Sequence, residues 1–527
     1  MQIKYSQLTR MSFNTLIGAL ALFSLTITPR SYAADLVESQ ALQSNPESSP
    51  LAPINKIDIL GSPNNQYQSV NNLQGGKYPA SPAAIAPDNS AAVEAEQLEI
   101  DKLKGEYISP YNYTQDPIAY NMGTTSVAGP NGTYHGGISS ISSANINLAG
   151  QNKGVFSDTA EVWGQTQRWG GFALGGGLTG SVSPVQTGQP NTFGTTGLII
   201  PSQAYVDWEY KDIFEFTAGN VILTNPWVNS ISSYPGATYA NSNNPFQAVQ
   251  ANVQVNDSLL LTGFQAFTYQ QYPNNWFNYQ TLYNSNAGFL NGLAQTSGAT
   301  GVGATWNPTN NYNFNLWYYN FIGQANMYYF DNHLHTTIAT NISMDFGIQY
   351  LNQSSSGDVF TSSTYTNLQG QTVQTQGIQS NAVGAEWAIN TGDNTLLVAY
   401  NNVFGNSNSY MNGAMITPYT YGLETDPLYT TPALSSLAEL GSGSAYLIKD
   451  TMHFLNSSLK ASLAFSQFFI NQVYATQTGM QTEYDAALQY SVPHTHLNLW
   501  GRVVYVQQAD NAGGDFIQPR FIMNWTF

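Results

Sequence analysis

The clearest pattern along this chain is an alternation of apolar and polar residues with a period of two. Over 312–319, every second position carries Tyr, Phe or Leu, and the first two positions between them are Asn. Comparable stripes run through 342–350 and 483–490. Because successive side chains of a strand point to opposite faces of a sheet, each stripe predicts a β-strand with one apolar face.

The last residues of the chain carry the same pattern. One face of this run is apolar, and the other face, with Arg520, Asn524 and Thr526, has Ile522 as its one apolar member. Such a strand, closing on Phe, looks like the last strand of a bacterial outer-membrane β-barrel, the sheet that leaves no unpaired backbone edge in lipid. An edge strand of a soluble β-sandwich is the alternative. The apolar face of this C-terminal barrel signature consists of Phe521, Met523, Trp525 and Phe527.

Strand and turn patterns continue from residue 107 to residue 527. At roughly 23 residues for a strand and its connection, this region predicts an all-β antiparallel transmembrane barrel of about 18 strands, with 16 as the alternative. A barrel of this size encloses an aqueous channel instead of a packed core. The segments 225–248 and 404–444 are long and rich in Asn, Gly, Ser and Pro, so we expect external loops or loops folded into the lumen.

The first 33 residues predict export from the cytoplasm. Lys4 and Arg10 precede a short apolar run over 16–27, and Pro29 and the small-residue site Ser31-Tyr32-Ala33 follow it. This is the order of a secretory signal peptide that is cut after Ala33. A membrane anchor is the alternative, but the run is interrupted and shorter than the roughly 20 apolar residues that a spanning helix needs.

Residues 34–106 differ in composition from the strand region. Ten of the chain's 31 acidic residues lie here, among many Pro, Ser, Asn and Ala residues. We interpret this segment as a flexible periplasmic or plug-like extension. A short helix is expected near 91–104, stopped by Gly105, and it serves either as a local tether or as part of an oligomerising coiled coil.

Placing the apolar stripe of every strand against lipid assigns the intervening residues to the lumen. This assignment predicts more acids than bases along the pore, and it leaves the facing of Arg168 open. The predicted pore-lining acids are Asp207, Glu209, Glu215, Asp345, Glu386, Glu483 and Asp485, and the predicted pore-lining bases are Lys211, Lys460, Arg502 and Arg520.

The charge of the whole chain agrees with an acidic lumen. No Lys or Arg occurs between Lys211 and Lys449, a stretch that contains eleven acidic residues. Three of the 14 bases lie within 1–33, so the chain after Ala33 carries 11 bases and 31 acids. Its formal net charge after cleavage is therefore about −20. An acidic pore favours small cationic or neutral hydrophilic solutes and repels polyanions, nucleic acids among them. The alternative for the loop acids is simple solvation, or divalent-cation binding at the lipopolysaccharide layer.

Two stretches of the chain resemble the OprD family of outer-membrane porins. The run 216–230, followed by 244–249, looks like that family's Gly-x-x-x-Leu-x-x-Pro strand and the loop after it, here with Gly219, Leu223 and Pro226. The C-terminal part, 446–527, is similar to the family's last strands in order and spacing. The resemblance implies an 18-stranded channel for small solutes with a constriction made by inward-folded loops.

The chain also departs from this family. Its members carry a ladder of Arg and Lys along the lumen that guides carboxylates, whereas few bases are available here, and the extension over 34–106 is not typical of the family. These departures put selectivity for anions in doubt.

Catalytic and metal chemistry find little support in the sequence. The absence of Cys excludes a disulfide scaffold and Cys-based zinc or thiol chemistry, and no Gly-x-Ser-x-Gly motif is present. The pairs His333/His335 and His494/His496 have metal-like spacing, and we interpret them as ordinary turn or girdle histidines. The sequence therefore predicts a porin that is no enzyme and has no catalytic residue, metal site or cofactor.

The expected partners follow from an outer-membrane porin. They are outer-membrane lipids and lipopolysaccharide, the barrel-assembly machinery and small-molecule solutes, with a homotrimer left open and no nucleic acid. Two other functions also stay open at this point: a plugged channel for hydrophobic substrates, and a structural or adhesive surface barrel. The sequence does not reveal the solute or the loop that constricts the pore.

Overall fold

The computed structural model describes most of the chain from Val127 onward. The predicted signal peptide, the extension over 34–106 and its expected helix lie outside the described residues, as does Phe527. The described residues are 127–129, 132–147, 153–187, 198–211, 213–230, 244–270, 277–279, 281, 296–309, 311–357, 360, 364–366, 372–374, 376–420, 426–455, 457–471, 479–508 and 514–526.

One antiparallel sheet dominates these residues. It contains 19 strands, of which β1 (Val127–Gly129) has three residues and pairs with the start of β2, so 18 long wall strands remain. The wall strands are β2 (Gly132–Asn147), β3 (Lys153–Thr166), β4 (Phe172–Thr187), β5 (Leu198–Tyr210), β6 (Phe214–Val221), β9 (Phe246–Asn256), β10 (Leu259–Tyr269), β11 (Ala299–Thr309), β12 (Tyr312–Phe321), β13 (Ala325–Ala339), β14 (Ile342–Ser355), β17 (Gln379–Asn390), β18 (Asn394–Val403), β19 (Gly443–Phe454), β20 (Leu459–Ile470), β21 (Met480–Ser491), β22 (Leu497–Gln507) and β23 (Phe516–Thr526).

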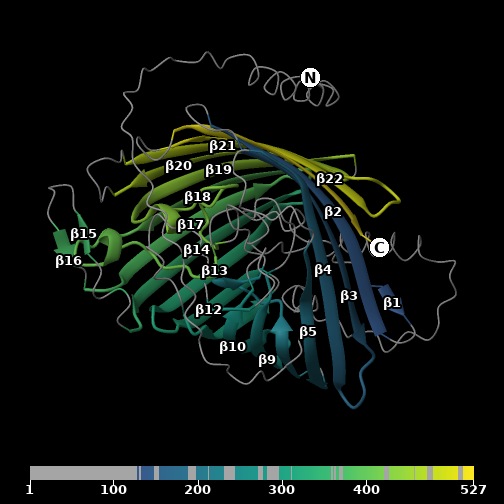
Figure 1. Ribbon diagram of the computed structural model, residues 1–527. Coiled ribbons are helices and arrows are strands. Elements are labelled where there is room, and N and C mark those ends of the chain that lie inside the picture. Colours follow the sequence, from purple (N-terminus) through teal and green to yellow (C-terminus); the bar gives the residue numbers. More distant parts are fainter. Residues whose placement is uncertain are drawn as a thin grey trace. The chain divides into compact units, whose positions relative to one another are not determined.

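The sheet closes on itself as a barrel. Each wall strand pairs with the next wall strand along the chain, and β23 pairs with β2 from Gly137–Thr526 to Asn147–Phe516 (Figure 1). Closure gives every wall strand two hydrogen-bonded neighbours and removes the sheet edges. The prediction of an 18-stranded antiparallel barrel is confirmed, and the 16-stranded alternative is set aside.

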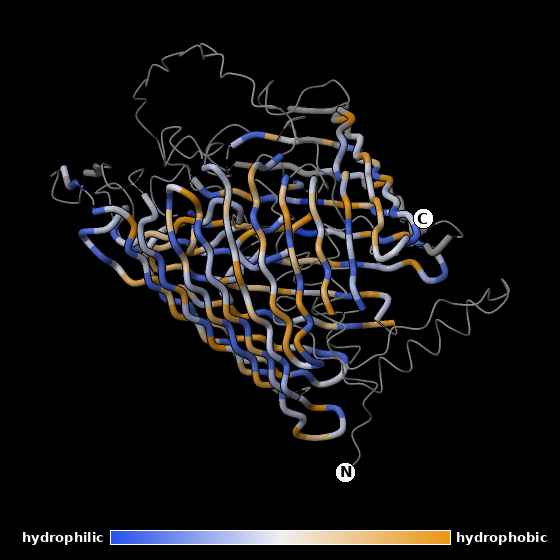
Figure 2. Tube along the Cα trace, turned by 90° about the horizontal axis from the view of Figure 1, so that it is seen from below, coloured by the Kyte–Doolittle hydropathy of each residue, from blue (hydrophilic) through white to orange (hydrophobic). Residues whose placement is uncertain are grey.

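The two faces of the wall differ in polarity, as the period-two stripes predict. On β23, Phe521 is 50% exposed on the outside, whereas Arg520 is 4% exposed on the inside. The same alternation of apolar and polar residues follows the wall strands in Figure 2. Exposed apolar side chains on the outer face include Leu316, Leu334, Phe346, Ile348, Tyr350, Val398, Ile448, Leu463, Phe521, Met523 and Trp525.

Connections at one end of the barrel are short. The β9–β10 turn contains two residues, 257–258, and the β13–β14 turn contains 340–341. Most connections at the other end are longer, although the β12–β13 turn contains only 322–324. The connections after β6, β14 and β18 also contain small elements of their own. Among the described residues, no helix is long and apolar enough to cross a membrane.

The β2–β23 seam can be tested by cross-linking. Ser142 and Phe521 are directly opposed across the seam, and both point outward. Opposed residues of antiparallel strands lie within the Cα separation that a disulfide spans, so the S142C/F521C protein should form an intramolecular disulfide upon oxidation.

The cross-linked chain should migrate differently from the reduced chain after boiling in detergent. S142C/W525C, on the same face but out of register because Trp525 opposes Ile138, serves as the control. Disulfides formed only between molecules, or equally well in both variants, would argue against this seam.

Candidate functional site

Two of the long connections fold into the barrel. They are the β6–β9 connection, described over 222–230 and 244–245, and the β18–β19 loop, described over 404–420 and 426–442. Their described residues include many of the most buried side chains in the molecule, which pack against inward-facing residues of β9–β14 and β17–β19. The cross-section inside the wall therefore depends on these two segments.

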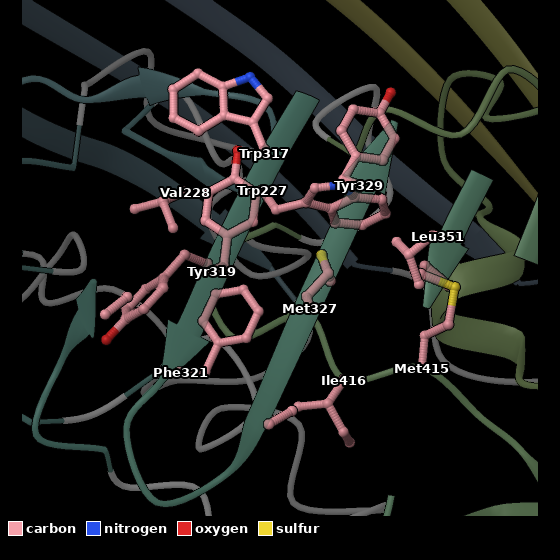
Figure 3. Close-up of a cluster of buried hydrophobic side chains, with 14 of the residues drawn as sticks. Trp227, Val228, Trp317, Tyr319, Phe321, Met327, Tyr329, Leu351, Met415 and Ile416 are labelled. Carbon is pink, nitrogen blue, oxygen red and sulfur yellow. The ribbon is translucent and has the colours of Figure 1, made fainter. Parts of the chain in front are cut away.

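The β6–β9 connection turns inward at the motif that resembles the OprD family. Gly219 has a φ of +135°, a backbone conformation that favours glycine, and Leu223 is fully buried just beyond β6. The short strands β7 (Thr224–Asn225) and β8 (Val228–Asn229) then form a small hairpin around Trp227. The Trp227 ring meets the Tyr329 ring of β13 edge-on, with their centroids 5.8 Å apart (Figure 3).

The β18–β19 loop is fastened to the inner wall by side-chain amides and hydroxyls. Gln353 of β14 donates to the carbonyl oxygen of Ile416 at 2.6 Å and accepts from the Ile416 backbone nitrogen at 2.9 Å. Ser380 of β17 donates to the carbonyl oxygen of Gly413 at 2.8 Å, and the backbone nitrogen of Thr430 donates to Asn401 Oδ1 of β18 at 3.0 Å. The wall thus satisfies backbone groups that water would satisfy in an external loop.

The two inward segments contact each other. Val228 forms an isolated β-bridge with Tyr419, whose ring lies 5.0 Å from the ring of Phe246 and 5.6 Å from that of Tyr269. Figure 3 shows Met415 of the β18–β19 loop on the other side of the Met327 side chain from Val228, and Ile416 of the same loop below Met327. Both segments therefore belong to one apolar cluster inside the barrel. Among the described residues, these two segments narrow the lumen.

Two of the predicted pore-lining acids bind the β18–β19 loop. Glu483 of β21 accepts from the backbone nitrogens of Leu434 and Ser435 at 2.7 and 2.8 Å, and Asp485 accepts from that of Ala433 at 3.1 Å. Carboxylate acceptors make stronger hydrogen bonds than neutral ones. Both side chains face the interior of the barrel, as predicted. Both bind backbone groups of the β18–β19 loop instead of being surrounded by solvent.

Three further acids lie near the short-turn end of β5 and β6. Asp207 is buried and forms an ion pair with Arg168, which also pairs with Glu209 at 2.8 Å. Thr217 donates to Asp207 at 3.0 Å, and Asn252 donates to Glu215 at 2.9 Å. Arg168, whose facing the sequence left open, thus neutralises part of this acidic group.

Lys211 does not belong to the inner wall, contrary to the sequence assignment. It lies beyond the end of β5, in the turn before β6, with a φ of +51° and an exposed side chain. Its Nζ lies 5.2 Å from the centre of the Tyr210 ring. The period-two assignment failed here because the strand ends at Tyr210, and the alternation of faces ends with it.

The remaining predicted bases lie on the last five wall strands. Arg502 of β22 and Arg520 of β23 are directly opposed and buried. Lys460 lies on the face of β20 that points into the barrel. Lys449 of β19, which the sequence assignment omitted, lines the same pocket as Asp485 and Arg502. Its inward position was readable from the buried residues Ala445 and Leu447 on the same face.

Asp345 and Glu386 belong to a buried polar cluster around His333. His333 lies on the inner face of β13 and is fully buried, so the interpretation of this residue as a turn or girdle histidine was wrong. Its Nδ1 lies 2.8 Å from Asp345 Oδ1 and 3.7 Å from Glu386 Oε1. Tyr429 of the β18–β19 loop donates to Asp331 beside it, and burial raises the pKa of the Tyr429 hydroxyl well above its ordinary value.

These contacts make a measurable prediction for Glu483. Substitution E483Q replaces one acceptor oxygen with an amide group that cannot accept from the backbone. One of the two hydrogen bonds is therefore lost, and the other is no longer charge-assisted. At about 1.5–3 kcal/mol for such a bond, segment 433–436 should open about 10–100-fold more often. Hydrogen–deuterium exchange of peptides covering this segment measures the opening.

The control for this variant is D393N, which removes an exposed acid in the β17–β18 turn. It should leave exchange at 433–436 unchanged. Equal exchange in E483Q and the parent protein would contradict a holding role for Glu483.

Comparison with known proteins shows a likeness of structure without a likeness of sequence. In sequence, neither a known protein family nor a curated protein matches the chain. In structure, 75% of the chain matches 98% of a BenF-like porin from Pseudomonas fluorescens Pf-5, with 10% identity and a TM-score of 0.61.

Two structures from Pseudomonas aeruginosa give the same result. The outer membrane protein OpdK matches 75% of this chain over 98% of its own length, with 10% identity and a TM-score of 0.59. OccD3 (OpdP) matches 79% of this chain over 97% of its own length, with 12% identity and a TM-score of 0.57. The resemblance to the OprD family is confirmed at the level of the fold: this chain has the fold of these outer-membrane porins.

Proposed function

We propose that this protein is an outer-membrane porin through which small hydrophilic solutes, cationic or neutral, diffuse passively. The observation that carries the proposal is the polarity of the wall: apolar side chains cover the outer face, and many of the inward positions hold Asn, Gln, Thr, Asp or Glu. An outer face of this kind suits lipid, and a polar inner face suits water and hydrophilic solutes. The fold that the chain shares with solved porins supports the same reading.

The contacts of the inward-facing acids favour a pore that is only weakly selective for cations. Asp207 and Glu209 pair with Arg168, and Glu483 is occupied by backbone groups of the β18–β19 loop. A charge that is paired at short range contributes little field to a passing ion. The excess of acids on the wall therefore acts mainly within the protein, and neutral solutes become as suitable a cargo as cations.

A second candidate is passage of small organic anions, and it rests on the bases of β19–β23. Lys449, Lys460, Arg502 and Arg520 lie on four of the five neighbouring strands β19–β23. The fifth strand, β21, carries Glu483 and Asp485, so these bases outnumber these acids on this arc although the whole chain is acidic. One of the similar solved structures is that of OpdK with vanillate, a carboxylate. In this candidate, the anion would follow that arc.

Reversal potentials across a planar bilayer under a salt gradient separate the two candidates. We expect the parent protein to show a weak cation preference near neutral pH. The variant K449Q/K460Q removes two bases from the arc and should shift the reversal potential further toward cations. A clear anion preference of the parent protein, lost in this variant, would replace the first candidate with the second.

Removing the β18–β19 loop tests whether the barrel conducts at all and whether this loop narrows it. Replacing 406–440 with a short Gly-Ser linker leaves β18 and β19 intact and should raise single-channel conductance severalfold, because conductance follows the open cross-section. Heat-modifiable migration on a gel serves as the folding control. A barrel that conducts equally with and without the loop contradicts this constriction, and a silent parent barrel would favour a structural role.

A further inference from the structure

Three neighbouring wall strands bring one imidazole and two carboxylates together inside the barrel. His333 comes from β13, Asp345 from β14 and Glu386 from β17, strands that lie side by side (Figure 1). One ligand atom from each residue lies within 4.8 Å of the others, and all three side chains are buried. His333 Nδ1 lies 2.8 Å from Asp345 Oδ1 and 3.7 Å from Glu386 Oε1, separations that atoms around a single metal ion have at bond lengths of about 2.0–2.2 Å.

The three side chains meet at a position where the wall has no side chain of its own, because the residue there is a glycine. Gly347 of β14 is opposed by His333 on one side and by Glu386 on the other. A Cβ at this position would lie 2.5 Å from His333 Cε1, 2.7 Å from Glu386 Cγ and 2.9 Å from Tyr429 Oη. The hole at Gly347 is therefore what permits the three side chains to converge.

Two carboxylate oxygens of this cluster point to a missing positive partner. Asp345 Oδ2 and Glu386 Oε2 are buried, and neither accepts a hydrogen bond. His335 Nδ1 lies 3.7 Å from Asp345 Oδ2, beyond hydrogen-bond distance, and it forms an ion pair with this oxygen only when the imidazole is protonated. Burying ionised oxygens without a partner is costly, and a bound cation removes this cost.

The far side of His333 has the support that metal-bound imidazoles usually have. His333 Nε2 lies 3.2 Å from Asp331 Oδ1 and 3.0 Å from Tyr429 Oη, and Tyr429 also donates to Asp331. A carboxylate on the second ring nitrogen orients the imidazole and increases its basicity. With Nε2 protonated toward Asp331, Nδ1 presents its lone pair toward Asp345 and Glu386.

We propose that His333, Asp345 and Glu386 form a binding site for a divalent transition-metal ion of the Zn²⁺ type. One imidazole nitrogen with two carboxylate oxygens suits such an ion better than Ca²⁺, which prefers oxygen ligands alone, and the two carboxylates balance its charge. Because Tyr429 belongs to the β18–β19 loop, an occupied site also fixes this loop to the wall. The proposal does not depend on which solute the barrel passes.

The test uses the full-length protein in detergent, freed of metal by EDTA dialysis and titrated with Zn²⁺ by calorimetry. We expect one Zn²⁺ per chain. H333N and E386Q should each weaken binding by at least about 100-fold, and D331N, which removes the support of the imidazole, by about 10–100-fold. The matched control H494A/H496A removes two exposed histidines of the β21–β22 turn and should bind as the parent protein does.

Three results would overturn the proposal. They are no stoichiometric Zn²⁺ in the parent protein, binding that survives in folded H333N and E386Q, or binding that is lost only in H494A/H496A. The first result would mean that the cluster is neutralised internally, with a protonated His333 between its carboxylates.

A second measurement keeps the proposal testable if H333N or E386Q fails to fold. Co²⁺ bound to the H494A/H496A protein should give a visible absorption spectrum of mixed nitrogen and oxygen ligation, and a Zn²⁺ equivalent should abolish it. G347A, which keeps every ligand but fills the hole, should lose this spectrum while remaining heat-modifiable. A spectrum that persists in folded G347A would also overturn the proposal.

Discussion

Closure of the sheet between β2 and β23 is the constraint on which the rest of the structure depends. A backbone amide or carbonyl in lipid has no water to bond, so every wall strand needs a hydrogen-bonded neighbour on both sides. The seam from Gly137–Thr526 to Asn147–Phe516 gives the first and last wall strands that neighbour. Once the ring is closed, the period-two alternation sends one set of side chains outward and the other into an enclosed space.

The enclosed space is then narrowed by the chain itself. An 18-stranded ring is too wide for its inward side chains to fill, and the connections after β6 and β18 occupy part of it. These connections bring aromatic and aliphatic residues, such as Trp227 and Tyr419, against the apolar part of the inner wall. They also bring backbone groups that need partners, and the wall supplies Gln353, Ser380 and Glu483 for them.

This arrangement changes the meaning of the acidic inner wall. An acid that holds a backbone segment, or pairs with Arg168, is a structural element and adds little to the field along the pore. The cluster of Asp345 and Glu386 around His333 is different, because one buried carboxylate oxygen of each acid has no hydrogen-bond partner. Excess charge of this kind, in a buried place, indicates a ligand more than a general selectivity for cations.

The sequence by itself determined the properties that repeat along the chain. The stripes over 312–319, 342–350 and 483–490 predicted strands and their faces, because the side-chain period of a strand is local and needs no knowledge of distant residues. For the same reason, Phe521, Met523 and Trp525 were correctly placed on the outer face. The length of the strand region predicted about 18 strands. The motif with Gly219, Leu223 and Pro226 marked the loop after β6, but the sequence left open whether this loop is external or folded into the lumen.

The tertiary structure decided which residues meet. Lys211 left the wall because β5 ends one residue earlier, a boundary that alternation alone does not show. Glu483 meets Leu434 and Ser435 only because the β18–β19 loop enters the barrel, and Tyr429 reaches His333 across 96 residues of sequence by the same route. Spacing along one strand predicts which face of the sheet a side chain takes. The residues that it contacts on other strands and on a folded loop depend instead on the strand register and on the path of the loop, which the closed barrel determines as a whole.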